Sequence, residues 1–114
     1  MRRRTAAVAA GLCLLAVCAA GFRADAEAGA RKPVTHTVTI DGARFSPADL
    51  NLNVGDSVVW VNKDILAHTA TSSTPGFDSK VIQPGKSWRH AFTRKGEFPY
   101  ACVFHPMNGI LRVK

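Results

Sequence analysis

Three side chains that can bind soft metal ions stand within six positions near the end of this 114-residue chain. They are Cys102, His105 and Met107, in the stretch YACVFHPMNG (residues 100–109). The Cys-x-x-His spacing allows a tight turn to direct both donors at one centre. Pro106 stiffens this turn, because proline fixes its own φ and restricts the residue before it. The stretch therefore predicts part of a metal site.

A fourth donor, His68, lies far from the others in sequence, but loops at one end of a β-sandwich lie close together. Two imidazoles, one thiolate and a weak thioether form the ligand set of an electron-transfer copper centre. Zinc is the alternative for a Cys/His/His set. Copper binds more strongly in the divalent series, and the absence of a Cys-x-x-Cys motif argues against a structural zinc site. The residues favour copper.

The first residues are typical of an export signal. Arginines at positions 2–4 precede an apolar run over residues 6–20, and small residues follow it up to Ala26. The run is too short to span a bilayer comfortably, and this order of basic, apolar and small residues is typical of a secretory signal peptide. We predict cleavage after Ala26, with Ala28 as the alternative, and a periplasmic or otherwise secreted product.

Two other interpretations of the N-terminus fit less well. A lipoprotein site at Cys18 would follow Val17, which is bulkier than the small residue expected there, and the arginines are not followed by the bulky apolar residue usual in twin-arginine signals. The expected organisation is a signal peptide over residues 1–26, a flexible segment over residues 27–33 and one domain over residues 34–114.

Composition limits the possible partners and raises the importance of Cys102. The chain has 15 Lys+Arg and 8 Asp+Glu; without residues 1–26 it keeps 11 and 7, a net charge of +4 over 88 residues. The sequence lacks the clustered basic stripe that nucleic-acid binding needs. Its mild positive charge suggests at most an acidic partner surface or an anionic membrane. Cys102 and Met107 are the only cysteine and methionine outside the signal. A lone thiol in an oxidising compartment needs burial or ligation.

Period-two alternation and frequent turns predict an all-β domain. In Val34–Ile40 the residues Val34, His36, Val38 and Ile40 share one face, with threonines on the other. Turn signals containing Gly or Pro separate the runs, and no stretch keeps a helical period for three turns. Many short strands of this kind imply a β-sandwich or barrel. The predicted strands are residues 34–40, 49–54, 57–62, 68–72, 87–92, 97–102 and 109–114.

Three stretches resemble small cupredoxins of the plastocyanin and amicyanin group. WVNKDILAHTA (60–70) resembles the family's first-histidine segment, Trp-x-Asn-x-Asp/Glu-x-x-x-His. PGKSWRHAFTRKGEFPYAC (84–102) resembles the strand pair before the copper cysteine, and CVFHPMNG (102–109) the ligand loop, Cys-x-x-His-Pro-x-Met-x-Gly. The resemblance covers essentially all of residues 34–114. It implies a Greek-key β-sandwich of about eight strands, a blue copper ion bound by His68, Cys102 and His105, and Met107 as the axial ligand.

The chain departs from the amicyanin-like pattern at two places. Only Pro106 separates His105 from Met107, where that pattern has two residues, so the ligand loop of this chain is tighter. Thr69 follows His68, where this group often has Asn. The hydrogen bond that such an Asn supplies would have to come from Thr69 or be missing, and changes of this kind tune the potential.

The resulting functional prediction is a soluble one-electron carrier that cycles between Cu(II) and Cu(I). We expect it to be a monomer without enzymatic activity or stable membrane insertion, and to dock transiently with redox partners near His105. Phe104 and Pro106, with Ile65 and Leu66, could form an apolar patch there. Periplasmic copper tolerance or delivery is the alternative function, and a β-sandwich interaction module without metal is a third. His36 and His90 are not expected to bind copper.

Overall fold

The computed structural model describes residues 31–114, and residues 33–114 form one compact unit. The predicted signal peptide lies outside the described residues. The described part contains eight strands and no helix, so no helix in it is long and apolar enough to cross a membrane. The strands are β1 (Thr35–Ile40), β2 (Phe45–Ser46), β3 (Asp49–Leu52), β4 (Ser57–Asn62), β5 (Thr71–Ser72), β6 (Ser87–Ala91), β7 (Gly96–Ala101) and β8 (Asn108–Val113).

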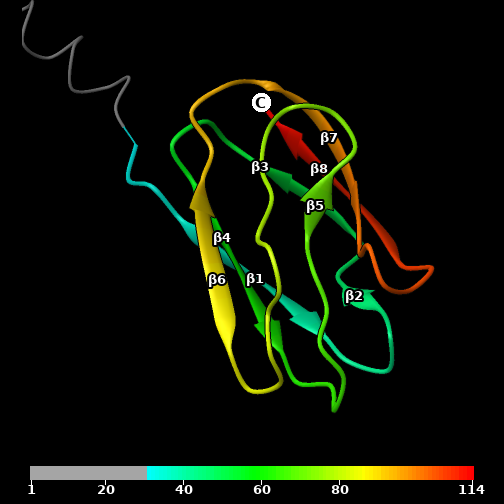
Figure 1. Ribbon diagram of the computed structural model, residues 1–114. Helices are drawn as coiled ribbons and strands as arrows, with labels where there is room; N and C mark the ends of the chain where they lie inside the picture. Colours follow the sequence, from blue (N-terminus) through cyan, green and yellow to red (C-terminus); the bar gives the residue numbers. More distant parts are fainter. Residues whose placement is uncertain (1–30) are drawn as a thin grey trace, which may run out of the picture. The chain divides into compact units, whose positions relative to one another are not determined.

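The strands form two four-stranded sheets, which Figure 1 shows as two layers. One has the order β2-β1-β4-β6 and the other β3-β8-β7-β5. β1 pairs in parallel with β4, and β3 in parallel with β8, whereas β4·β6, β7·β8 and β5·β7 are antiparallel. Parallel neighbours that are not consecutive in sequence require connections that cross between the sheets. The predicted all-β Greek-key sandwich of about eight strands is confirmed.

Alternating side chains build the core between the sheets. Val38 and Ile40 of β1 and Val58 and Trp60 of β4 are fully buried. The threonines of β1 lie on the opposite face, as the period of two requires. In the register of β4 with β6, Trp60 lies beside Trp88, and their ring centroids are 5.5 Å apart. The apolar face that the sequence predicted for β1 is thus the core face.

A buried carboxylate fastens one end of the sandwich. The Oδ1 atom of Asp56 accepts a hydrogen bond from the N–H of Val34, and its Oδ2 atom accepts one from the N–H of Asn53 and lies 3.0 Å from Nε2 of His36. Asp56 has no exposed surface. These contacts join the start of β1 to the turn before β4, so His36 has a structural partner away from the metal-binding residues.

The loop between β7 and β8, at the right-hand edge of Figure 1, lies against the connection that follows β4, since Sγ of Cys102 is 3.7 Å from Nδ1 of His68. The loops that carry the predicted ligands therefore meet at one end, as expected for a sandwich.

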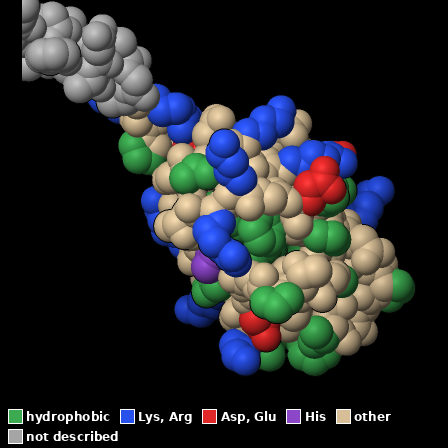
Figure 2. Space-filling view, turned by 90° about the horizontal axis from the view of Figure 1, so that it is seen from above, with side chains coloured by type: hydrophobic (Ala, Val, Ile, Leu, Met, Phe, Trp, Pro, Cys, Tyr) green, Lys and Arg blue, Asp and Glu red, His purple; other side chains and the backbone are tan. Residues whose placement is uncertain are grey.

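Figure 2 looks onto the domain from above. Lys and Arg side chains are spread among neutral surface there and are more prominent than Asp and Glu.

Candidate metal centre

The structure brings together His68, Cys102 and His105. The Sγ atom of Cys102 lies 3.7 Å from Nδ1 of His68 and 3.8 Å from Nδ1 of His105. One ligand atom from each of the three residues lies within 4.8 Å of the other two. His68 is fully buried and Cys102 is 6% exposed, whereas His105 is half-buried. Three of the four predicted donors thus converge, and His105 is the one that reaches the surface.

Backbone pairing places His68 beside the end of β7. His68 forms an isolated antiparallel bridge with Ile82, in which each N–H donates to the other's carbonyl at 3.2 and 2.8 Å. Three residues later, Thr71 pairs with Ala101 in the register of β5 with β7. Cys102 directly follows Ala101. His68 and Cys102, 34 residues apart in sequence, are therefore brought together by the pairing of β5 with β7.

Asp64 orients His68, a role that was not predicted from the sequence. Its Oδ2 atom lies 2.8 Å from Nε2 of His68 and also accepts the N–H of Ala43. The N–H groups of Ala43 and Ile65 and the imidazole hold the pKa of Asp64 below its usual value, so the carboxylate is ionised and acts as an acceptor. Nε2 must then carry the hydrogen, which leaves Nδ1 free to bind a metal. The only sequence signal for this orienting role was the Asp-x-x-x-His spacing of Asp64 and His68.

Asn62 holds the segment between Asp64 and His68 in place. Its side-chain amide is fully buried and donates to the carbonyls of Leu66 and Ile82 at 2.8 and 2.9 Å, while its Oδ1 atom accepts the N–H of Asp64. One side chain therefore supports both the loop that carries the orienting carboxylate and the segment that pairs with His68.

Backbone amides stabilise the thiolate of Cys102. Burial raises the pKa of Cys102, but the N–H groups of Thr69 and Phe104, each 3.4 Å from Sγ, and the two imidazoles lower it from 9.0 to about 6. The thiolate is the form that binds metals. The sequence left open whether Thr69 supplies a hydrogen bond beside the site, and it does: its Oγ1 atom accepts the N–H of Val103 at 3.0 Å.

Met107 closes the ligand loop through its backbone. Its N–H donates to the carbonyl of His105 at 2.8 Å, and its carbonyl accepts the N–H of Cys102 at 3.3 Å. Met107 is 3% exposed and belongs to the same core cluster as Cys102. The single-residue spacing is thus accommodated by a tight turn, and axial ligation by Met107 stays a prediction.

Gly109 is needed for space. A Cβ atom at this position would lie 2.4 Å from Cζ and 2.6 Å from the hydroxyl oxygen of Tyr100. The tyrosine ring of β7 packs directly onto the backbone of β8 at this position.

The remaining histidines do not join the site. His36 lies beside Asp56, and the ring of His90 stacks on Trp88 with centroids 5.3 Å apart. Burial lowers the pKa of His90. The predicted apolar patch is exposed: Ile65 is 88%, Phe104 53% and Leu66 48% exposed. Pro106 and Val103 are exposed as well, and Val103 had not been predicted as part of the patch.

The donor set fits a copper ion. A metal about 2.3 Å from a thiolate and about 2.0 Å from an imidazole nitrogen, with about 120° between the bonds, would separate the donors by about 3.7 Å. The two S···N distances, 3.7 and 3.8 Å, match this spacing. A trigonal His/His/Cys arrangement is typical of electron-transfer copper centres.

Comparisons with known proteins agree with this chemistry. A family model for a cupredoxin-like domain matches residues 8–113. The methylamine utilization protein MauL of Methylophilus methylotrophus is 28% identical over 99 residues, covering 82% of this chain and 57% of that protein. Amicyanin of Paracoccus denitrificans is 24% identical over 74 residues, covering 60% of this chain and 56% of that protein. The chain thus spans little more than half the length of these relatives.

Solved structures share the fold. A purple cupredoxin from Nitrosopumilus maritimus is 26% identical with a TM-score of 0.65, covering 69% of this chain and 99% of that one. A copper-containing nitrite reductase from Thermus scotoductus is 33% identical with a TM-score of 0.67, but only 23% of that chain is covered. An amicyanin variant, 23% identical over 70% of this chain and 82% of its own, has a TM-score of 0.66. The chain belongs to the cupredoxin-like family, with one copper ion as its cofactor.

Proposed function

We propose that this protein is an exported, monomeric, non-enzymatic carrier of single electrons. Its copper would be held by His68, Cys102 and His105, with Met107 as the axial ligand. When bound, copper supplies a one-electron Cu(II)/Cu(I) couple. The observation that carries the proposal is the convergence of one thiolate and two imidazole nitrogens at 3.7–3.8 Å.

Hydrogen bonds hold two of these donors firmly, which suits electron transfer. Asp64 fixes the ring of His68, and the amides of Thr69 and Phe104 point at the sulfur of Cys102. A centre whose ligands keep one arrangement needs little reorganisation when the charge changes. The thiolate and thioether suit Cu(I), and the imidazoles suit both oxidation states.

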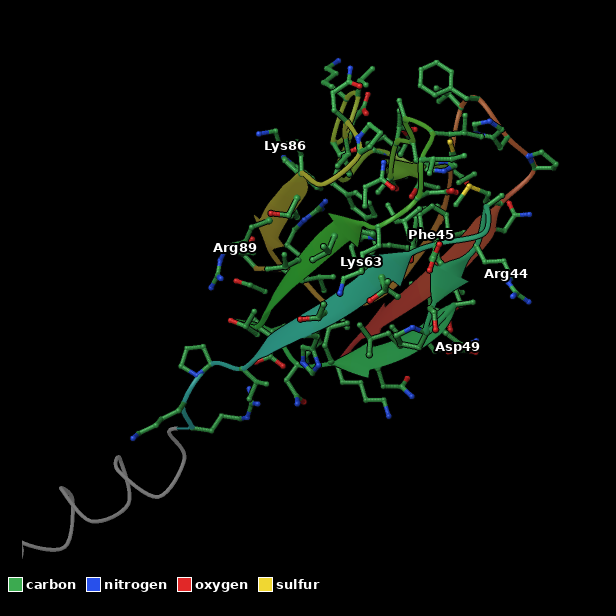
Figure 3. The ribbon with its side chains drawn as sticks, turned by 90° about the horizontal axis from the view of Figure 1, so that it is seen from below. Arg44, Phe45, Asp49, Lys63, Lys86 and Arg89 are labelled. Carbon is green, nitrogen blue, oxygen red and sulfur yellow. The ribbon has the colours of Figure 1, made fainter. Side chains whose placement is uncertain are left out.

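We propose that partners dock transiently over the half-buried His105, on an apolar rim formed by Ile65, Leu66, Val103, Phe104 and Pro106. Basic residues flank this end: Figure 3 shows Lys86 at the start of β6, on one edge of the first sheet, and Arg44 at its β2 edge, whereas Arg89 bonds Thr35 at the other end of β1. Electrostatic complementarity speeds encounter more than it strengthens binding. A partner with an apolar contact surrounded by acidic groups would match this arrangement.

We also propose the domain organisation expected from the sequence: a signal peptide over residues 1–26, a flexible segment over residues 27–33, the domain over residues 34–114, and delivery to the periplasm. The basic, apolar and small-residue pattern supports this proposal, as does the lone thiol of Cys102, which copper would protect from oxidation.

Copper titration tests the proposal. Addition of Cu(II) to the purified domain should produce an intense sulfur-to-copper absorption and a type 1 paramagnetic resonance spectrum, with one equivalent bound. Cys102→Ser should abolish the colour. His36→Gln is the matched control, because its imidazole lies outside the site, and it should leave the spectrum unchanged. Colour in the Cys102→Ser variant would refute the assignment.

The axial ligand needs its own variant. Met107→Leu keeps a buried apolar side chain but removes the thioether, so it should alter the visible spectrum and raise the reduction potential if sulfur binds the metal. Unchanged spectra would remove Met107 from the ligand set and leave the three other donors in place.

The one-residue spacing between His105 and Met107 favours a second candidate, copper tolerance or delivery. A distorted centre would exchange electrons slowly. Electron transfer predicts a reversible potential and fast electron self-exchange. Slow exchange, together with copper sensitivity of cells that lack the protein, would favour the second candidate.

A further inference from the structure

A chain of side-chain hydrogen bonds leads from the ligand loop to a carboxylate outside the centre. The N–H of Val103, the residue after Cys102, donates to Oγ1 of Thr69 at 3.0 Å. Oγ1 of Thr69 lies 3.0 Å from Oγ1 of Thr71, which donates to Oδ1 of Asp78 at 3.1 Å. We call Thr69, Thr71 and Asp78 the threonine relay.

The direction of every hydrogen bond in the threonine relay is fixed. The backbone N–H of Lys80 and the hydroxyl of Thr71 hold the pKa of Asp78 below its usual value, so its carboxylate is an acceptor. Thr71 therefore donates its single hydroxyl hydrogen to Asp78. Because a hydroxyl has only one hydrogen, Thr69 must donate to Thr71, and its lone pairs face the N–H of Val103. Each bond thus polarises the next in the same sense.

The backbone around the relay is anchored on both sides. Asp78 forms an isolated bridge with Thr71, and its Oδ1 atom accepts the N–H of Lys80 at 2.9 Å. The neighbouring Ser79 is buried and binds both the N–H and the carbonyl of Ala70. The segment over residues 77–79 is therefore fixed against the segment over residues 70–72, so Asp78 is a firm end point for the relay.

Resting on the proposed copper site, we propose that Asp78 is a remote positioning residue, which acts through Thr71 and Thr69 to hold the turn between Cys102 and His105 and to tune the reduction potential. Thr69 is the point of transmission. Its hydroxyl fixes the amide of Val103, and its own N–H donates to the sulfur of Cys102 at 3.4 Å. Asp78 touches no metal ligand, and its side chain is 43% exposed.

The chemical consequence follows from the amides around the sulfur. N–H groups directed at a metal-bound thiolate withdraw charge from it and favour the reduced metal, so their loosening lowers the potential. If the relay is broken at Thr71 or Asp78, the turn after Cys102 loses its tether, and the amides of Thr69 and Phe104 are held less well against the sulfur. We therefore expect a lower potential in relay variants.

The first test measures amide hydrogen exchange in the chelator-treated, reduced protein. Thr71→Val and Asp78→Ala should each accelerate exchange at Val103 about threefold to tenfold, the effect of one net hydrogen bond. The double variant should exchange no faster than either single one, because both changes break the same chain. Thr71→Ser, which keeps the hydroxyl, should restore the original rate.

Two controls separate the relay from general effects. Lys80→Gln removes only the cation 3.5 Å from the Asp78 carboxylate and should leave exchange at Val103 unchanged. Leu111 is fully buried in β8, and its amide should keep its rate in all variants. Wild-type exchange at Val103 in both relay variants, or equal acceleration at Leu111, would overturn the proposal.

The second test measures the reduction potential of the copper-loaded proteins. Thr71→Val and Asp78→Ala should lower it and change the visible spectrum, whereas Thr71→Ser and Lys80→Gln should not. Altered exchange with an unaltered potential would overturn the tuning role and leave a structural tether. If no variant, wild type included, binds copper, the proposed function fails, while the exchange result still decides whether the relay holds the loop.

Discussion

Replacing Gly109 with alanine should destabilise the domain through a single contact. The new Cβ atom would lie 2.4, 2.6 and 2.7 Å from Cζ, the hydroxyl oxygen and Cε1 of Tyr100, whereas ordinary contact begins at 3.4 Å. The ring would have to retreat by about 1 Å. It is 1% exposed and packs against Phe45 at a centroid distance of 4.6 Å and Trp60 at 5.6 Å. It has little room to move.

The cost can be placed on the scale known for overpacked cores, about 1–3 kcal/mol, and at its upper end because the new methyl group is fixed to the backbone. For a domain of this size, about 3 kcal/mol lowers the melting temperature by on the order of 10–20 °C. Urea and thermal unfolding of the chelator-treated protein would measure the loss. Tyr100 and Gly109 each lie two residues outside the Cys102–Met107 loop, so copper spectra should change too.

A double-mutant cycle with Tyr100→Leu tests the cause. Without the ring, Gly109→Ala should cost less than about 1 kcal/mol, because the clash has gone. Gly76→Ala is the matched control: its Cβ would lie 3.1 Å from the Phe98 ring, so a shift of a few tenths of an ångström relieves it. Gly109→Ala within about 0.5 kcal/mol of wild type, or an equal cost in both backgrounds, would refute the steric explanation.

Three further predictions concern the carboxylates and the thiol. Asp64→Asn should weaken copper binding about 10–100-fold, as for other carboxylates that orient metal-binding histidines; chelator competition measures this, and an unchanged affinity would contradict the orienting role. Alkylation of Cys102 in the chelator-treated protein should have its midpoint near pH 6 instead of 9.0. Because this pKa is lowered in the folded state, the thiolate's contribution to the free energy of unfolding should be complete above pH 9 and fall as the pH drops towards 6. A difference in unfolding free energy from Cys102→Ala that does not change with pH would argue against this. Asp56→Ala should cost about 3 kcal/mol in urea unfolding, since two backbone N–H groups and one imidazole lose their acceptor, and a loss below about 1 kcal/mol would show that water replaces it.

Local patterns predicted most of the fold. Strands such as β4 (Ser57–Asn62) have long alternating runs, and their predicted and observed bounds coincide. β2 (Phe45–Ser46) was missed because two residues carry no period. The strand predicted over residues 68–72 contains only β5 (Thr71–Ser72), because His68 pairs with Ile82 and Ala70 with Ser79, in the loop that precedes β6. Such pairing depends on tertiary contacts that the local sequence does not contain.

The site shows the same division between local and distant information. The types and spacing of Cys102 and His105 were readable, whereas the sequence left open the hydrogen bond that Thr69 supplies. The role of Asp64 was visible only as a spacing of four residues before His68. The link to Asp78 was not readable, because it depends on how a loop folds back onto β5. Ligand chemistry is thus encoded locally, whereas the support of the ligands depends on the whole fold.

The hydrogen bond from Ala43 to Asp64 has a consequence for engineering. Ala43 lies in the exposed turn between β1 and β2, with a φ of 55°, and its N–H shares the Oδ2 atom that orients His68. Glycine can adopt this backbone easily, whereas proline would remove the N–H and β-branched residues would resist the angle. Variants from a saturation library at this position, and proteins with a peptide tag grafted into this turn, should therefore retain copper only if they keep this N–H and this backbone angle. Mutational tolerance at this half-buried turn position is set by the buried histidine.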